Sequence, residues 1–175
     1  MNLFKCFSFI LFLAWLQPCQ AEGMPEGRIK SAYVLNFAKF VEWPNGTEWV
    51  DDKVTLCVVG NDVLGGALEE LDGRKAGGRE LRVVQHSAAS DLHSCQMVFI
   101  GESEQRRFGS IIKALGDSPV LTISDIDDFA EKGGCIGLRY REDKIVFEVN
   151  LASTQRLRLH LPSQLLNLAS YVFGR

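Results

Sequence analysis

The sequence predicts an α/β fold. We expect a single compact domain with a mixed, mostly parallel sheet, flanked by helices and carrying a C-terminal antiparallel hairpin. The first observation behind this is that apolar runs of strand length alternate with segments of helical pattern. The second is that two further strand patterns flank a charged turn at residues 141–143, which is typical of a hairpin. The apolar runs occupy residues 53–60, 80–84, 97–100 and 120–123.

A long helix is predicted at the start of the domain, from about Pro25 to about Glu42. Proline favours the first helical position, Glu26 places a negative charge in the first turn, and Pro44 prevents continuation. The apolar arc is too wide for a helix that buries one stripe, so we expect most sides to be covered and the domain to pack around this helix. The arc holds Ile29, Tyr33, Phe37, Phe40 and Val41.

Two residues interrupt the pattern of this helix. Asn36 lies inside the apolar arc, where an amide needs hydrogen-bond partners. We interpret it either as a structural hydrogen bond to neighbouring backbone or as a polar anchor for a ligand or partner in an apolar groove. Leu35 lies inside the polar arc and is expected to be exposed. Leu35 and Lys39 are therefore candidate partner-binding residues on this helix.

The remaining elements follow from capping residues, glycines and periodicity. Helices are expected at 63–71, 104–115 and 124–131, and the hairpin strands at 135–140 and 144–151. A short strand is expected at 157–161, before a last helix that starts at Pro162. The apolar face of that helix holds Leu165, Leu166, Leu168, Ala169, Val172 and Phe173.

Residues 1–21 have the pattern of a signal peptide, with Lys5 before an apolar run and small residues before a cleavage point after Ala21. A lipidated Cys19 is the weaker alternative, because Pro18 precedes it. No later stretch is apolar for 18 residues. We therefore expect an exported, soluble domain at residues 22–175, without membrane insertion after cleavage. Its mild net negative charge, −3 for the full chain, argues against nucleic-acid binding.

No catalytic residue, metal site or cofactor is predicted. The turn Gly60–Gly66 follows a strand and opens a helix, which favours capping over anion binding because no phosphate-binding fingerprint is present. Capping is likewise preferred to cation binding for the aspartates that follow the fourth apolar run, Asp125, Asp127 and Asp128. The three histidines form no metal-ligand spacing.

Polar residues near the C-terminus are the other candidates for partner binding. In the second hairpin strand, Glu148 and Asn150 alternate with apolar residues, so they either face solvent or contact a helix or partner. Arg156 and Arg158 form a basic edge, which either binds a partner or prevents edge-to-edge aggregation.

Three cysteines remain after signal cleavage. Cys57 lies in one strand and Cys95 just before another, so a disulfide between them is compatible with the strand spacing of about 4.8 Å. Cys135 is then odd, either as a small buried apolar residue or as half of an intermolecular bridge.

Five motifs give the chain its resemblance to a known family. In order they are KSAYVLNFAKFVEWP (30–44), LCVVG (56–60), CQMVFIGESE (95–104), FEVNL (147–151) and SQLLNLA (163–169). From about Glu26 to about Val172, the chain resembles the YfiR family of small periplasmic proteins. The stretch Ser153–Leu161 departs from the family's usual pattern of a helix end, Gly-Leu and a short strand.

The resemblance implies a repressor that binds the periplasmic part of an inner-membrane diguanylate cyclase, YfiN, and so lowers cyclic di-GMP and biofilm formation. It also implies self-association, and a disulfide whose cysteines match Cys57 and Cys95. The leading hypothesis is thus a periplasmic, non-enzymatic regulator with that partner. The alternatives are a small-ligand-binding module with its ligand near Asn36 or the Gly60 turn, a regulator of another membrane receptor, and a hydrolase of unrecognised chemistry.

Overall fold

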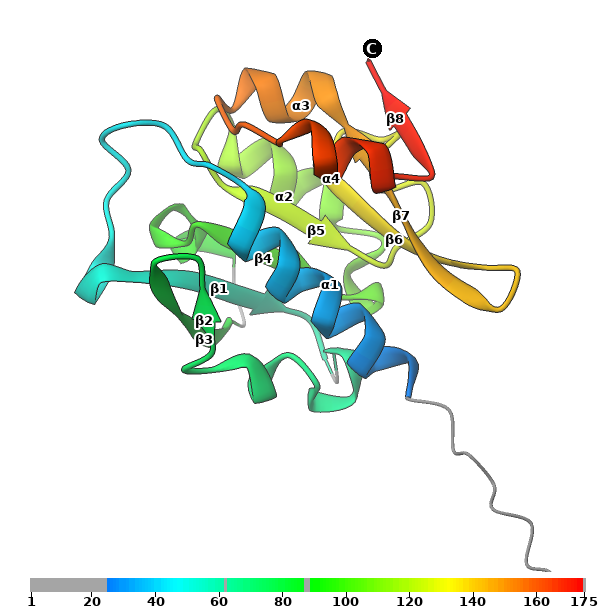
Figure 1. The fold of residues 1–175 in the computed structure, drawn as a ribbon, viewed down its shortest axis with the longest axis horizontal. Coiled ribbons are helices and arrows are strands. Elements are labelled where there is room, and N and C mark those ends of the chain that lie inside the picture. Colours follow the sequence, from blue (N-terminus) through cyan, green and yellow to red (C-terminus); the bar gives the residue numbers. More distant parts are fainter. Residues whose placement is uncertain (1–24, 62, 87–88, 175) are drawn as a thin grey trace, which may run out of the picture.

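The computed structural model describes residues 25–61, 63–86 and 89–174, and it contains one mixed sheet with the strand order β2-β3-β1-β4-β5-β6-β7-β8 (Figure 1). The predicted signal segment lies outside these residues. Strands β1, β3, β4, β5 and β6 run parallel to one another, whereas β7 is antiparallel to β6. The strands are β1 (Lys53–Val59), β2 (Lys75–Ala76), β3 (Arg79–His86), β4 (Met97–Ile100), β5 (Leu121–Ser124), β6 (Ile136–Arg141), β7 (Lys144–Asn150) and β8 (Tyr171–Phe173).

Helices cover both faces of the sheet, as the sequence predicts. The helices are α1 (Glu26–Phe40), α2 (Phe108–Leu115), α3 (Leu151–Arg156) and α4 (Ser163–Leu168). Alternate side chains of each central strand enter different cores. Leu56 and Phe99 pack on the side of α1 and α4, while Val59 and Ile100 pack on the side of α2. The mostly parallel α/β sheet with an antiparallel hairpin is therefore confirmed.

The first helix is bounded as predicted, but its covered side differs. Its buried apolar residues are Val34, Leu35, Phe37 and Ala38, and Val41 follows directly. Ala32, Asn36, Lys39 and Phe40 are exposed, so α1 lies on the sheet rather than inside a shell of other elements. The expectation of cover on most sides is wrong, because no element packs over the outer side of α1 among the described residues.

Several short elements differ from the predicted helices. Residues 63–71 form two 3₁₀ turns, Val63–Gly66 and Glu69–Leu71, in place of one helix. In the first of these turns, Leu64 and Gly65 have positive φ. The segment 104–115 is helical only from Phe108, and residues 125–133 form turns with no helix. The first and last of these segments contain positive-φ positions, at Leu64 and Gly65 and at Asp128, which interrupt helical hydrogen bonding.

The C-terminal segment differs most from the prediction. Residues 151–156 form α3, and the expected strand at 157–161 is reduced to a single bridge between His160 and Glu42. The last helix, α4, has only six residues and is followed by β8, which adds to the sheet parallel to β7. Consequently β7 is an inner strand, and β8 forms the edge.

Candidate functional site

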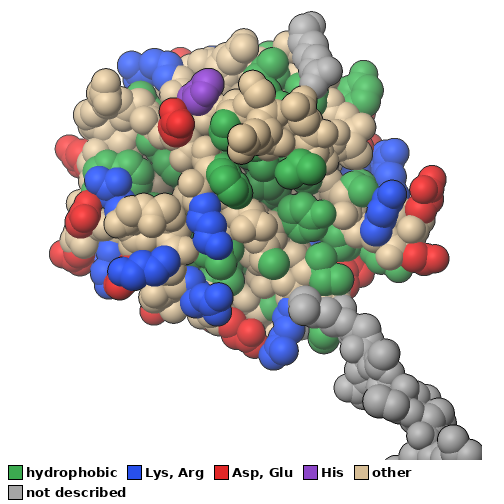
Figure 2. Space-filling view, viewed as in Figure 1, with side chains coloured by type: hydrophobic (Ala, Val, Ile, Leu, Met, Phe, Trp, Pro, Cys, Tyr) green, Lys and Arg blue, Asp and Glu red, His purple; other side chains and the backbone are tan. Residues whose placement is uncertain are grey.

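An apolar groove lies between α1 and α4. It has a volume of about 150 Å³ and is lined chiefly by Tyr33, Asn36, Phe40, Phe147, Leu165 and Leu168. Figure 2 shows hydrophobic side chains gathered over these two helices. Leu168 is 74% exposed and Phe40 is 47% exposed, and both large apolar side chains line this groove.

The floor of the groove is a rigid aromatic cluster. The Phe37 and Phe147 rings are 5.2 Å apart in an edge-on arrangement, and Tyr33 is 5.8 Å from Phe147. The Tyr33 hydroxyl donates to the Ile145 carbonyl at 3.1 Å, which fixes the ring against β7. Such clusters hold their shape because aromatic side chains have few rotatable bonds and pack with defined geometry.

The solvent exposure of Leu35 and Asn36 is the reverse of what the helical pattern predicts. Leu35 is 8% exposed and belongs to the core, so it is wrong as a partner-binding candidate. Asn36 is exposed at the groove and so needs no internal partner. Lys39 is exposed on the same helix, so both polar side chains remain available to a partner. Leu35 and Asn36 differ from the prediction because the side of α1 that meets the sheet is centred on Val34 and Ala38, and not on the predicted apolar arc.

The two hairpin candidates have structural contacts. Glu148 is 5% exposed, and its carboxylate pairs with Arg141 at 3.2 Å and with Arg139 at 3.7 Å. The solvent-facing alternative is therefore wrong for Glu148, which lies on an inner strand between β6 and β8. The Asn150 side chain accepts from the Ser153 amide at 2.8 Å and donates to the Ala130 carbonyl at 2.7 Å. Asn150 is thus the N-cap of α3.

The basic edge is not a strand. Arg156 ends α3, where its guanidinium lies 2.6 Å from an Asp117 carboxylate oxygen and donates to the Gly116 carbonyl at 3.1 Å. Arg158 is exposed and has a positive φ of 58°. The predicted strand edge is therefore wrong, although both arginines are exposed.

A larger cavity, about 880 Å³, lies at the carboxyl ends of β1 and β4. The loop after β1 and the loop after β4 form opposite walls, tied by the Asn61 amide, which donates to the Ser103 hydroxyl at 3.0 Å. The first turn of α1 closes a third side, where Gly27 lies so near Leu64 that a Cβ would stand 2.4 Å from the Leu64 carbonyl oxygen. The Gly60 turn, a predicted ligand position, thus borders the largest cavity described here.

A buried ion pair forms one wall of this cavity. The Lys30 ammonium lies 2.6 Å from a Glu26 oxygen and 2.9 Å from Oδ2 of Asp125, and its side chain is 10% exposed. Burial opposes the charge on Lys30, but the hydrogen bonds and charges of Glu26 and Asp125 outweigh it and raise the lysine pKa. Oδ1 of Asp125 is buried and has no hydrogen-bond partner among the described residues. The sequence predicts Asp125 only as part of a helix-capping segment. Its ion pair with Lys30 on α1 joins residues 95 positions apart, and no sequence pattern predicts such a contact.

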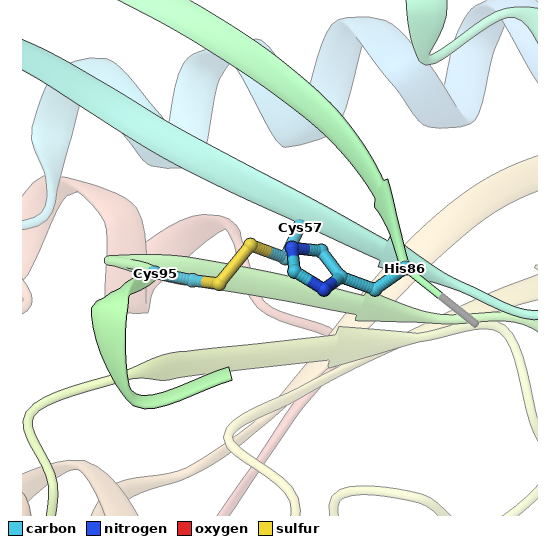
Figure 3. A group of neighbouring side chains, drawn as sticks. All are labelled: Cys57, His86 and Cys95. Atoms are coloured by element: carbon cyan, nitrogen blue, oxygen red, sulfur yellow. A yellow bond between two sulfur atoms is a disulfide. The ribbon is translucent and has the colours of Figure 1, made fainter. Parts of the chain in front are cut away.

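The disulfide between Cys57 and Cys95 is present, with Cα atoms 5.9 Å apart. His86 lies at the end of β3, and Figure 3 shows its ring beside the bridge. The ligand atoms of these three residues lie within 4.8 Å of one another, but both sulfur atoms are already bonded, so the oxidised protein has no thiolate to offer a metal. Cys135 is a buried free thiol, and burial raises its pKa, which makes it unreactive.

Solved structures with a similar fold come from distant proteins. A conserved domain protein from Vibrio cholerae O1 biovar El Tor matches with a TM-score of 0.55 and 10% identity over 85% of this chain. An ABC domain in complex with L-Trp, from Streptococcus pneumonia, matches with a TM-score of 0.54 and 8% identity over 84% of this chain. This chain spans 60% of the length of each of those chains. At these identities the likeness concerns the fold alone.

The family comparison covers most of the chain. A family model described as YfiR/HmsC-like matches residues 27–170, which include the groove, the disulfide and nearly all of the cavity. Within the part of the chain that the structure describes, no helix combines the length and the apolarity that a membrane span requires.

Proposed function

The chain belongs to the YfiR/HmsC-like family, and from this membership we propose that it is a periplasmic, non-enzymatic regulator of cyclic di-GMP signalling. It binds the periplasmic domain of an inner-membrane diguanylate cyclase of the YfiN kind and holds the enzyme inactive, which lowers cyclic di-GMP and biofilm formation. The family resemblance supplies the class of partner. The observation that carries the binding role is the exposed apolar groove between α1 and α4.

The groove has the features of a protein-binding surface. Leu168 and Phe40 are exposed anchors on a rigid aromatic floor, and Asn36 and Lys39 provide polar contacts at the rim. A shift from a mostly active to a mostly inactive cyclase requires about 5.5 kcal/mol of differential binding. Burial of a fully exposed large apolar side chain contributes roughly 1.5–3 kcal/mol, and Phe40 and Leu168 are already partly buried, so the two anchors supply part of that energy.

Charge substitution in the groove tests this proposal. Deletion of the gene is expected to raise cellular cyclic di-GMP and surface attachment, and the wild-type gene should restore both. Leu168→Asp should fail to restore them, because a buried carboxylate opposes docking. Val50→Asp is the matched control, since Val50 is 48% exposed and lies outside the groove. Both variants should keep the wild-type melting temperature.

One outcome would contradict the regulator. It is unchanged cyclic di-GMP after deletion under several growth conditions, with no cyclase recovered alongside the purified protein. Full repression by Leu168→Asp at wild-type abundance would instead leave the regulator in place and exclude the groove as its contact surface.

A small-ligand-binding module is the second candidate function. The cavity of about 880 Å³ beside the Gly60 turn favours it, since α/β proteins bind ligands outside the carboxyl ends of parallel strands. The two roles are compatible, because a ligand that prefers one conformation of the protein changes its affinity for a partner.

A further inference from the structure

We propose that the cavity at the carboxyl ends of β1 and β4 binds a small molecule through a primary ammonium group. This inference rests on the ligand-binding candidate described above and names the chemical class of its ligand. It is independent of the cyclase, since the cavity borders the first turn of α1 and the apolar groove begins at Tyr33, farther along the helix.

The strand order places the cavity where α/β folds bind ligands. β1 lies between β3 and β4 in the sheet, and β3 precedes β4 in the chain. After β1 the chain therefore forms β3 on one side of it and then crosses to form β4 on the other side. The loops that follow β1 and β4 diverge at this point, and a crevice forms between them. Both loops line the observed cavity, through Asn61 and Gly65 on one side and Gly101 and Ser103 on the other.

The charges around the cavity favour a cation. Four carboxylates line it, from Glu26, Glu70, Glu102 and Asp125, against two cationic side chains, Arg28 and Lys30. Arg28 is paired with Glu70 at 3.3 Å, and Lys30 is shared between Glu26 and Asp125. Glu102 is exposed and has no ion pair among the described residues. The walls thus carry more negative than positive side chains, and Glu102 is the carboxylate left without an ion pair among the described residues.

Asp125 provides a second, buried acceptor. Its Oδ2 holds Lys30, while Oδ1 is buried without a hydrogen-bond partner among the residues described. Asp125 also lines a neighbouring cavity of about 230 Å³, so its carboxylate stands in the wall between two spaces. Oδ1 has no exposed surface and Oδ2 pairs with Lys30, so a ligand ammonium reaches this carboxylate only when the side chain rotates about its broad terminal torsion. An ammonium offers three N–H donors, enough to bond Asp125 and Glu102 together.

Two kinds of molecule carry this group. A diamine would use the carboxylates alone, whereas an amino acid would also place its carboxylate near Arg28 and the positive end of the α1 dipole. Their shared feature is the ammonium, and the site is assigned to that feature.

Titration calorimetry on the purified protein, at constant ionic strength, distinguishes a site for a diamine from a site for an amino acid. The probes are 1,4-diaminobutane, 4-aminobutyrate and butyrate, which share a four-carbon chain. Binding of either amine, with none of butyrate, supports the proposal. A preference for the diamine indicates a polyamine-like ligand, and a preference for 4-aminobutyrate indicates an amino acid. Absence of binding by both amines, or equal binding of butyrate, overturns it.

Variants locate the site. Glu102→Gln removes an exposed charge and should weaken amine binding roughly tenfold, the loss expected for one charge-assisted hydrogen bond, at an unchanged melting temperature. Glu131→Gln is the matched control, because Glu131 is exposed and lines neither cavity. Asp125→Asn should also weaken binding, provided that its circular dichroism spectrum matches the wild type. Equal binding by Glu102→Gln and Glu131→Gln excludes this cavity.

Discussion

At the scale of single residues, Lys30 is a largely buried charge held by two carboxylates. Its ammonium contacts Glu26 one turn earlier on α1 and Asp125 after β5, so it links the first helix to the sheet. The Asp125 side chain is 12% exposed, and its only cation within ion-pair distance among the described residues is Lys30. A carboxylate in this position depends on the lysine, because an unpaired buried charge is costly.

Lys30→Met is expected to lower the free energy of unfolding by about 2–4 kcal/mol, because Asp125 is left buried without its cation. Lys113→Met is the control, since Lys113 is exposed on α2. Urea unfolding monitored by circular dichroism measures both. The double variant Lys30→Met/Asp125→Leu should recover part of the loss. A single variant as stable as the wild type would show that the pair contributes nothing.

The same lysine predicts a pH dependence. Burial opposes its charge, but its partners raise its folded-state pKa above the ordinary value of 10.5. A group with a raised pKa contributes stability that is fully present below the ordinary value and is lost as pH rises through the folded value. The difference in unfolding free energy between wild type and Lys30→Met should therefore be constant from pH 7 to about pH 9 and shrink above pH 10.5. A difference that grows with pH would contradict this assignment.

At the scale of elements, a glycine sets the distance between α1 and the turn after β1. A Cβ at Gly27 would stand 2.4 Å from the Leu64 carbonyl oxygen, closer than any van der Waals contact. The contact is with backbone, which cannot rotate away as a side chain does. The close approach of helix and turn, and with it one wall of the cavity, therefore requires glycine at this position.

Gly27→Ala should destabilise the protein by roughly 1–3 kcal/mol, because α1 must move away from the turn. Gly109→Ala is a matched control in α2, where an added Cβ meets no atom within 4 Å. That variant should gain up to about 1 kcal/mol from higher helix propensity. Thermal unfolding of the two variants measures these changes in stability. Equal changes for Gly27→Ala and Gly109→Ala would contradict a role for the close contact between α1 and the turn.

At the scale of the whole molecule, the disulfide joins two neighbouring strands at the centre of the sheet. Cys57 lies in β1 and Cys95 just before β4, and the bridge closes a chain segment with a sequence separation of 38 residues. That segment includes β2, β3 and the loop along one side of the cavity. A cross-link of this span restricts the unfolded chain strongly.

Reduction should lower the stability of the whole domain by roughly 3–4 kcal/mol in the chain-entropy treatment of a loop this long. Urea unfolding with and without a phosphine reductant measures the change. Cys135→Ala controls for the third thiol, which is buried and outside the bridge. Peptide mapping without reductant should recover Cys57 and Cys95 as one linked pair. Free thiols at both positions in protein isolated from cells would contradict the bridge.

The sequence by itself determined the features that depend on local pattern. The boundaries of α1, the central strands β1 and β4 and the hairpin are close to the predicted ranges, because periodicity, prolines and turn residues act within a few positions. The Cys57–Cys95 bridge, which the strand spacing allowed and the family resemblance implied, is present. The family motifs extended the predicted resemblance from about Glu26 to about Val172, and the family match to residues 27–170 confirms it.

Only the tertiary structure decided which side chains are covered and which loops meet. Leu35 is buried and Asn36 is exposed because only one side of α1 faces the sheet. Glu148 is buried on an inner strand, where its carboxylate pairs with Arg139 and Arg141. The cavity joins Lys30 to Asp125, which are 95 positions apart in the chain. Burial and charge pairing depend on neighbours brought together by strand order, and strand order has no signature in local periodicity.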